Sequence, residues 1–317
     1  MNKYASLSID LDNLWAYLKV YGDPKWKQYP SYSKIIVPRI LSLLSRHNIK
    51  TTFFIVGQDA SSSENADIMQ KIAAEGHEFG NHSYDHEPWM EDRDQNEIVL
   101  ELAKTHQAII AATGKPPVGF RGPGFCCNQK ILEAVHTLNY SFDASLFPTV
   151  ISPIARLYYL FNTKPLNDTA KLQRKNLFGG IKNGFMPLKP FKWHLSGGEL
   201  LEIPVTTIPL FRIPFHLSYI MWLSKFSKKG ALNYFRFALW ICKARGVEPS
   251  LLLHPLDFLG KDDVPELSFF PGMDLSSEHK LEIANTLLST FSDQFKILTM
   301  SEHALLHNSQ LKTIIHN

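Results

Sequence analysis

Residues 4–12 read YASLSIDLD, a strand-like run that ends in polar residues, and this pattern recurs along the chain. Short β-rich runs alternate with segments whose apolar residues recur at three- and four-residue spacing, which is typical of βα units. The predicted strands cover 4–10, 50–57, 77–83, 118–124, 140–145, 200–207, 249–255 and 295–300. Eight such strands with helices between them favour an α/β fold of the (β/α) barrel type, with an open doubly wound sheet as the alternative.

Helical periodicity fills the intervals between the runs and sets the domain organisation. Apolar residues at helical spacing predict helices over 36–44, 68–73, 98–109 and 131–138, and Gly76 and Gly114 stand where helix C-caps belong. The stretch from about 147 to 199 interrupts this pattern with Pro, Lys, Asn and Gly. It has too few periodic apolar residues for a core of its own, so we expect one domain over 1–317 with an insertion at the barrel rim.

Composition limits the function classes. The 317 residues are 44% hydrophobic and 20% charged, which is enough to bury a large core. The start of the chain lacks a basic segment followed by an apolar one, and Cys126, Cys127 and Cys242 show no disulfide or zinc-knuckle spacing, so we expect buried thiols in a cytoplasmic protein. A net charge of +3 is too small to indicate nucleic-acid binding.

Polar residues with catalytic chemistry stand at the carboxyl ends of the predicted strands. Alone, the two histidines of GNHSYDHEP (80–88) would more often be solvated loop residues than metal ligands. In a barrel, however, the carboxyl ends of the strands converge on one face, where active sites of this architecture are built. The residues at these ends are Asp10, Asp12, His82, His86, Arg121, Asp143 and His254.

These residue types predict a catalytic metal site. Asp12, His82 and His86 would be the ligands, because one carboxylate and two imidazoles leave coordination positions open on a divalent ion. Asp10 would be the base that activates a bound water. Arg121 would hold Asp10 through a charge-assisted contact, bidentate in its strongest form, although a barrel-rim salt bridge is the alternative.

The predicted general acid follows the seventh predicted strand. His254 is placed to protonate a leaving amine, and Asp143 would orient and charge its imidazole. A lone histidine after an apolar strand is ordinarily a core residue. Its position at a strand end favours the catalytic interpretation here.

This ordered set of motifs resembles the polysaccharide deacetylases, the NodB-homology or carbohydrate esterase 4 family. The similarity runs from SIDLDN through KTTFFIVG, GHEFGNHSYDH, GFRGPG and YSFDAS to LLLHPLD. It implies a distorted barrel of seven or eight parallel strands, a divalent metal that is most often zinc, and removal of an acyl group from an amino sugar or, in some branches, cleavage of another amide. It also assigns the same roles to the seven strand-end residues.

The chain departs from the usual form of that family. Leu11 separates Asp10 from Asp12, which makes it a D-x-D variant, Gly124 stands where an aromatic residue is usual, and the fourth motif is reduced to FDAS. Gly124 could still offer its backbone N–H to a developing oxyanion. The alternatives to an amino-sugar deacetylase are a hydrolase of a small non-sugar amide, similar to allantoinase relatives, and an inactive carbohydrate-binding protein.

A basic stretch is not explained by the resemblance. Between Asp168 and Glu248 the only acidic residues are Glu199 and Glu202. The basic residues of this interval are Lys171, Arg174, Lys175, Lys182, Lys189, Lys192, Arg212, Lys225, Lys228, Lys229, Arg236, Lys243 and Arg245. Aromatic residues interleave them, as in a helix at a membrane interface, and Lys225, Lys228 and Lys229 would meet anionic headgroups. Two ordinary barrel helices with solvated basic faces are the alternative. The interfacial interpretation predicts an N-acylated sugar on a phosphorylated lipid carrier as substrate.

Overall fold

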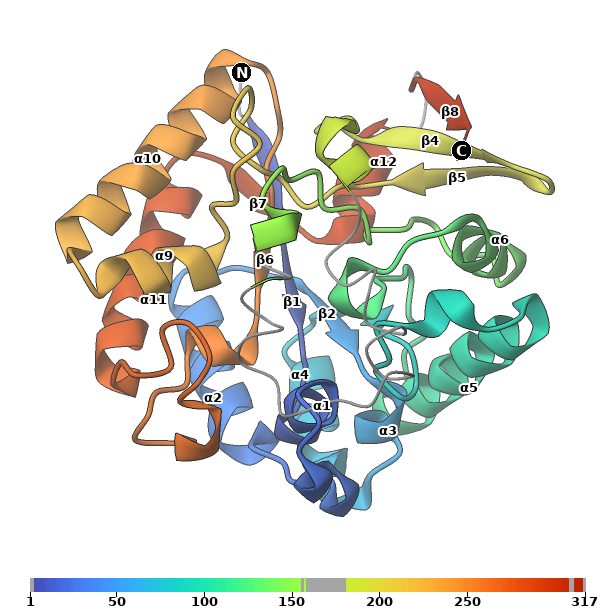
Figure 1. Ribbon diagram of the computed structural model, residues 1–317, viewed down its shortest axis with the longest axis horizontal. Coiled ribbons are helices and arrows are strands. Elements are labelled where there is room, and N and C mark those ends of the chain that lie inside the picture. The colour runs from blue at the N-terminus through green and yellow to red at the C-terminus, as the bar shows by residue number, and fades with distance from the viewer. Residues whose placement is uncertain (1–2, 155–156, 158–180, 308–310, 316–317) are drawn as a thin grey trace.

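The computed structural model describes residues 3–154, 157, 181–307 and 311–315, and its centre is a parallel sheet (Figure 1). Strand β1 (Tyr4–Asp10) lies between β2 (Thr52–Ile55) and β6 (Ser250–Leu253), and β3 (Glu78–Asn81) follows β2. Strand β7 (Lys296–Leu298) pairs with the first half of β1. The inner strands are buried along their length, as expected for parallel strands covered on both faces.

The sheet closes into a distorted barrel beyond β3. Single parallel bridges join Asn81 to Phe120, Phe120 to Asp143, and Asp143 to Glu202. The ring is completed where the backbone N–H of Thr206 donates to the carbonyl of Ser250 in β6 at 3.1 Å. The predicted α/β barrel is therefore confirmed.

Two of the predicted strands contribute only single bridges to this ring. In the run 118–124, Gly119 offers no side chain and Pro123 no donor, and both features weaken a strand. A Cβ at Gly119 would lie 2.3 Å from the ring of Phe142, so the two segments pack too closely for a larger residue. The segments around Phe120 and Asp143 therefore enter the barrel as short irregular passages.

Helices surround the strands, with α9, α10 and α11 on one side and α5 and α6 on the other (Figure 1). The predicted helices are confirmed, and Gly76 and Gly114 adopt φ values of +78° and +71° at helix ends, where glycine is favoured. The helices are α1 (Leu14–Val20), α2 (Ser33–Arg46), α3 (Gly57–Ala60), α4 (Ala66–Ala74), α5 (Gln95–Thr113), α6 (Gln129–Thr137), α9 (Leu217–Ser224), α10 (Lys228–Ala244), α11 (Ser277–Ser292) and α12 (Met300–His307).

A second small sheet carries the end of the predicted insertion. Strands β4 (Phe191–Leu195) and β5 (Gly198–Glu202) form an antiparallel hairpin, and β8 (Thr313–Ile315) pairs with β4. Phe191 and Trp193 of β4 are buried in a core that also contains Leu102 of α5 and Ile131 of α6. This part of the predicted insertion therefore packs into the domain.

Part of the predicted insertion and of the basic stretch falls outside the described residues. This applies to 155–156 and 158–180, which include Lys171, Arg174 and Lys175. The aromatic and basic segment that follows forms α9 and α10. Among the described helices, none has both the length and the apolar composition that crossing a membrane requires.

Candidate active site

Residues predicted at the strand ends lie together at one end of the barrel. Asp10 is the last residue of β1, and Asp12 follows two residues later. His82 comes directly after β3, His254 directly after β6, and Arg121 directly after the bridge at residue 120. All of these side chains except that of His254 are buried.

Three side chains form a compact group of metal-binding type. Oδ1 of Asp12 lies 3.2 Å from Nε2 of His82 and 2.9 Å from Nε2 of His86. The three ligand atoms all lie within 4.8 Å of one another. Two imidazoles and one carboxylate are a donor set of catalytic zinc sites, which keep a coordination position open. The residues present therefore fit a divalent metal ion.

The hydrogen bonding of this group also fits a bound cation. Nδ1 of His82 lies 2.6 Å from the carbonyl oxygen of Arg121, and because a carbonyl only accepts, Nδ1 carries the proton. Nε2 of His82 is left to face Asp12. Oδ1 of Asp12 and both ring nitrogens of His86 are buried without a hydrogen-bond partner among the described residues. Orphaned buried polar atoms are rare and call for a specific cause, such as an ion held between them.

The electrostatics of the group favour a positive charge at its centre. Burial by itself would raise the pKa of Asp12, but His86 and His82 hold that pKa well below its usual value. Burial would likewise lower the pKa of His82, yet the charges of Asp10 and Asp12 raise it. The site therefore favours an ionised Asp12 and a proton on His82, and a divalent cation would compete with that proton for the same position.

Arg121 holds Asp10 as predicted, but through one nitrogen. Nη1 of Arg121 lies 3.3 Å from Oδ1 of Asp10, and the guanidinium lies over the ring of Phe54 at 4.7 Å. The bidentate form of this contact is not found, because Nε and Nη2 of Arg121 have no partner among the described residues. The contact joins two buried side chains, so it is an internal ion pair and not the solvated rim salt bridge considered as the alternative.

His254 lies on the other side of Asp10. Its Nε2 is 4.0 Å from Oδ2 of Asp10, and its Nδ1 is 3.4 Å from the hydroxyl of Ser218 in α9. The backbone N–H of His254 donates to Oδ2 of Asp257 at 2.8 Å, which fixes the turn after β6. With 19% of its side chain exposed, His254 is the most accessible of the predicted catalytic groups.

The predicted pairing of Asp143 with His254 is wrong for the described structure. Oδ1 of Asp143 accepts a hydrogen bond from the hydroxyl of Ser145 at 2.7 Å, and that hydroxyl accepts from the backbone N–H of Gly122 at 2.7 Å. The bridge at Asp143 also places it against Glu202, and burial raises the pKa of both carboxyls. Asp143 therefore positions the backbone that follows Arg121, and it does not reach the imidazole of His254.

Gly124 lies on that same backbone. It belongs to a short 3₁₀ turn (Pro123–Phe125) and has φ +60°, a backbone conformation that residues other than glycine rarely adopt. A residue with a side chain would be strained at this position. Its role as an oxyanion donor stays a prediction.

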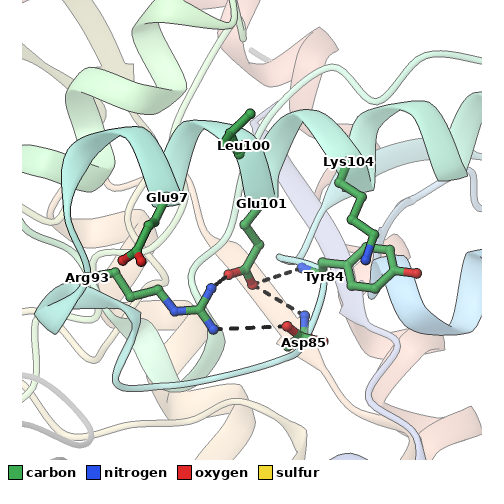
Figure 2. A pocket seen from close by; sticks show the side chains of 7 residues that line it. All are labelled: Tyr84, Asp85, Arg93, Glu97, Leu100, Glu101 and Lys104. Carbon is green, nitrogen blue, oxygen red and sulfur yellow. Dashed lines mark hydrogen bonds and ion pairs between the residues drawn. The ribbon is translucent and has the colours of Figure 1, made fainter.

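The loop between the two predicted histidine ligands is held by Glu101 of α5, which contacts Tyr84 and Asp85 of that loop (Figure 2). Oε1 of Glu101 accepts hydrogen bonds from the backbone N–H groups of Tyr84 at 3.2 Å and Asp85 at 3.3 Å. Arg93 forms an ion pair with the other oxygen of this buried carboxylate. The loop needs such support, because His86 has φ +49°, a conformation that costs energy in a non-glycine residue.

A pocket of about 510 Å³ opens between this loop and α5 (Figure 2). Its lining includes Glu97, Leu100 and Lys104 of α5 as well as the residues that support the loop. None of the three ligand side chains lines it. We therefore assign this pocket to the outer side of the loop and not to the substrate.

Two further residues beside the candidate site were not predicted from the sequence. The ring of His216 lies 6.0 Å from that of His254, and burial, together with the charges of His254 and Arg121, holds the pKa of His216 well below its usual value. Glu101 is the second. Neither follows a predicted strand, so no local signal singles them out.

Comparisons with known proteins show which family the chain resembles. The model of the family described as polysaccharide deacetylase matches residues 29–142. A peptidoglycan-N-acetylglucosamine deacetylase of Listeria monocytogenes is 33% identical over 103 residues, which are 32% of this chain and 22% of that protein. A Bacillus cereus protein with the same description is 37% identical over 86 residues, covering 27% of this chain and 30% of that protein.

A longer match and a structural match extend this likeness. A peptidoglycan deacetylase of Helicobacter pylori is 26% identical over 194 residues, 59% of this chain and 64% of that protein. The aligned segment thus spans less than two thirds of each of these relatives. A crystal structure of a Mycobacterium smegmatis protein provisionally assigned as a polysaccharide deacetylase shares the fold, with a TM-score of 0.62, 17% identity, and coverage of 100% of this chain and 96% of that one. By its sequence matches, residues 29–142 of this chain are similar to the polysaccharide deacetylases, and its barrel is similar to that of the Mycobacterium smegmatis protein.

Proposed function

We propose that this protein is a metal-dependent hydrolase that removes an N-acyl group, acetyl in the simplest case, from an amino sugar. The observation that carries the proposal is the convergence of Asp12, His82 and His86 within 4.8 Å of one another, beside Asp10 and His254. A structural zinc site would not need an acid and a base next to it. The names of the relatives support a sugar amide as the substrate class.

The side chains divide the chemistry of amide hydrolysis between them. A bound divalent ion would supply polarisation of the acyl carbonyl and acidification of the attacking water. Asp10, oriented by Arg121, accepts a proton from that water as the new C–O bond forms. His254 donates a proton to the nitrogen as the C–N bond breaks. The products are a carboxylic acid and a free amine, which balances the reaction with water as the only co-reactant.

The backbone beside the site has a supporting part in the proposal. Gly124 and its neighbours follow Arg121 directly, and Ser145 anchors them through the N–H of Gly122. An N–H group in this turn would donate to the oxygen that becomes negative when the carbonyl is attacked. Asp143, hydrogen-bonded to Ser145, would keep that turn in place.

We also propose a lipid-linked substrate, because α9 joins the active site to an exposed aromatic surface. Ser218 of α9 contacts His254, and Trp222, one turn further along the same helix, is 42% exposed. Phe226, two residues after the end of α9, is 73% exposed, and its ring centroid lies 5.3 Å from that of Trp222. Such a surface beside a catalytic group suits a substrate whose sugar is presented at a membrane interface.

The predicted lysines take part in this surface to different degrees. Lys225 forms an ion pair with Asp274 at 2.6 Å, and Lys228 pairs with Glu282, whereas Lys229 has no ion pair among the described residues. Exposed pairs of this kind are weak and exchange readily with other anions. The three cysteines are free thiols, which supports the cytoplasmic leaflet as the proposed location.

A panel of substrates tests the catalytic proposal. Purified protein is incubated with N-acetylated and N-formylated nucleotide sugars, lipid-linked sugars, oligosaccharides and a small cyclic amide such as allantoin, and released acid or ring-opened product is detected by mass. We expect acid from a sugar substrate, released roughly 10²- to 10⁴-fold more slowly by the Asp10→Asn variant. Hydrolysis of the cyclic amide alone would replace the proposal by the non-sugar amidase. Binding of a sugar with no turnover would indicate an inactive relative.

Liposome flotation tests the membrane part separately. The protein should float with anionic vesicles at low salt and be released at high salt, and Phe226→Ser should weaken flotation. Leu305→Ser is the matched control, because Leu305 on α12 is also 73% exposed but lies outside the aromatic surface. Changing Lys225, Lys228 and Lys229 to Glu should reduce binding further. Protein that stays unbound at low salt would exclude the lipid-linked substrate and leave a water-soluble saccharide.

A further inference from the structure

A second group of metal-binding side chains lies at the opposite end of the barrel. Glu248 stands two residues before β6, and His303 and His307 lie on α12, which follows β7. Nδ1 of His303 lies 2.8 Å from the hydroxyl of Ser6 in β1. Ser6 precedes Asp10 by four residues of the same strand, a separation of about 13 Å, so this group is distinct from the active site.

The geometry of this group resembles that of the first. Oε2 of Glu248 lies 3.4 Å from Nε2 of His303, and Nε2 of His307 lies 2.6 Å from the same oxygen. Histidines four residues apart on a helix present their rings on one face. Ligands at zinc-like bond lengths in a tetrahedral site are about 3.3 Å apart, so a small opening of the Glu248–His307 contact would admit an ion.

One atom of the group points independently to a ligand. His303 is completely buried, and its Nε2 has no hydrogen-bond partner among the described residues. The oxygen of Glu248 that contacts His307 lies 3.4 Å from this buried nitrogen. A metal ion satisfies both groups, because it needs a deprotonated imidazole nitrogen and an anionic oxygen.

We propose that Glu248, His303 and His307 form a second, structural site for a divalent transition metal of the zinc class. Two imidazoles and a carboxylate favour Zn²⁺, Co²⁺ or Ni²⁺ over Mg²⁺ and Ca²⁺, which prefer oxygen ligands. His307 and Glu248 are each partly exposed, so the ion has a path from solvent. Bound there, it would tie α12 to the segment that enters β6 and, through His303 and Ser6, to β1.

The competing interpretation is a simple ion pair between His307 and Glu248, and zinc binding at equilibrium separates the two. The full chain is stripped with a chelator and dialysed against Zn²⁺. We expect about two equivalents in the wild type and about one in the Asp12→Ala/His86→Ala variant, which lacks two ligands of the first site. Adding His307→Ala to that variant should remove the remaining equivalent. Adding His194→Ala, an exposed histidine on β4, should leave it bound.

Thermal melting provides a readout that does not depend on activity. Zinc should raise the melting temperature of the Asp12→Ala/His86→Ala protein and should not raise it once His307→Ala is added. If His307→Ala impairs folding, Glu248→Gln, which keeps the size of the side chain, decides the question in the same assays. The proposal is overturned if the variant without the first site binds no zinc, or if its zinc survives both His307→Ala and Glu248→Gln. Failure of the catalytic proposal would change only the zinc content of the wild type, because the Asp12→Ala/His86→Ala protein reports on the second site alone.

Discussion

Nη1 of Arg121 lies 3.3 Å from Oδ1 of Asp10, and both side chains are buried. The guanidinium is thus the nearest cation to the carboxylate that would act as the base, with the ring of Phe54 against it, and Nε2 of His82 and of His254 each lie 4.0 Å from the other oxygen of Asp10. Two buried charges of this kind depend on each other, because removing one leaves the other out of water and without its closest charged partner.

Arg121→Met should therefore destabilise the metal-free protein by about 3–5 kcal/mol, the usual cost of leaving one buried charge unpaired. Adding Asp10→Asn should recover most of that loss, since the remaining partner is then neutral. Urea denaturation of the wild type, both single variants and the double variant measures this coupling. Additive effects of the two substitutions would show that the ion pair contributes nothing beyond packing.

Removing any ligand of the first site should abolish metal at that site and activity together. Asp12→Ala, His82→Ala and His86→Ala each delete one of only three protein ligands. Metal analysis after dialysis measures how much metal the first site holds. It is done in a His307→Ala background so that the second proposed site does not contribute. A His86→Ala protein that kept its metal and full turnover would refute the ligand assignment.

The base and the acid should be separable from metal binding. Asp10→Asn and His254→Ala should keep the metal and lose roughly 10²- to 10⁴-fold in rate, the range for a positioned acid or base. The wild type should show a bell-shaped pH–rate profile. His254→Ala should lose only the decline at high pH, and an unchanged profile would show that His254 is not the acid.

Glu101 should act on the metal through the loop that it supports. Glu101→Ala removes the acceptor for the N–H groups of Tyr84 and Asp85, and loss of such supporting contacts typically costs 10- to 100-fold in metal affinity. Competition with a chromophoric chelator measures the change. Leu100→Ala is the matched control, since Leu100 lines the same pocket at 69% exposure and makes no hydrogen bond to the loop. Equal affinities in the two variants would assign Glu101 to general stability.

His77 should make the fold sensitive to acid. Burial, followed by the charges of Lys50 and Lys115, lowers the pKa of His77 to about 4, and its Nδ1 accepts the backbone N–H of Thr51 at 3.3 Å. As the pH falls below about 6.5, His77 takes up a proton in the unfolded chain but stays neutral in the folded protein. The free energy of unfolding therefore declines until about pH 4. The full loss is about 3 kcal/mol.

His77→Asn tests this directly, because asparagine keeps an acceptor for Thr51 and does not titrate. Denaturation at pH 7 and pH 4.5 should show a smaller loss of stability in the variant than in the wild type. The comparison between the two proteins cancels the other carboxylates and histidines that titrate in this range. An equal loss in both would mean that His77 is not the group responsible.

The sequence by itself determined the barrel and the position of most of the proposed catalytic residues. Strand and helix periodicities are local properties, and Asp10, Asp12, His82 and His254 directly follow or end β-rich runs that the structure confirms as β1, β3 and β6. Because parallel strands share one carboxyl end, local placement was sufficient to bring these side chains together.

Only the tertiary structure decided the contacts of side chains that do not meet simply by sharing the carboxyl end of the parallel strands. Asp143 also follows a β-rich run, yet its carboxyl faces Ser145 and Glu202 and not His254, because its strand is reduced to a single bridge beside Glu202. Glu101 reaches the histidine loop from the middle of a helix, and Glu248 meets His303 across more than fifty residues. Such contacts depend on the direction of each side chain and on the packing of distant segments, and no periodicity in the sequence encodes either.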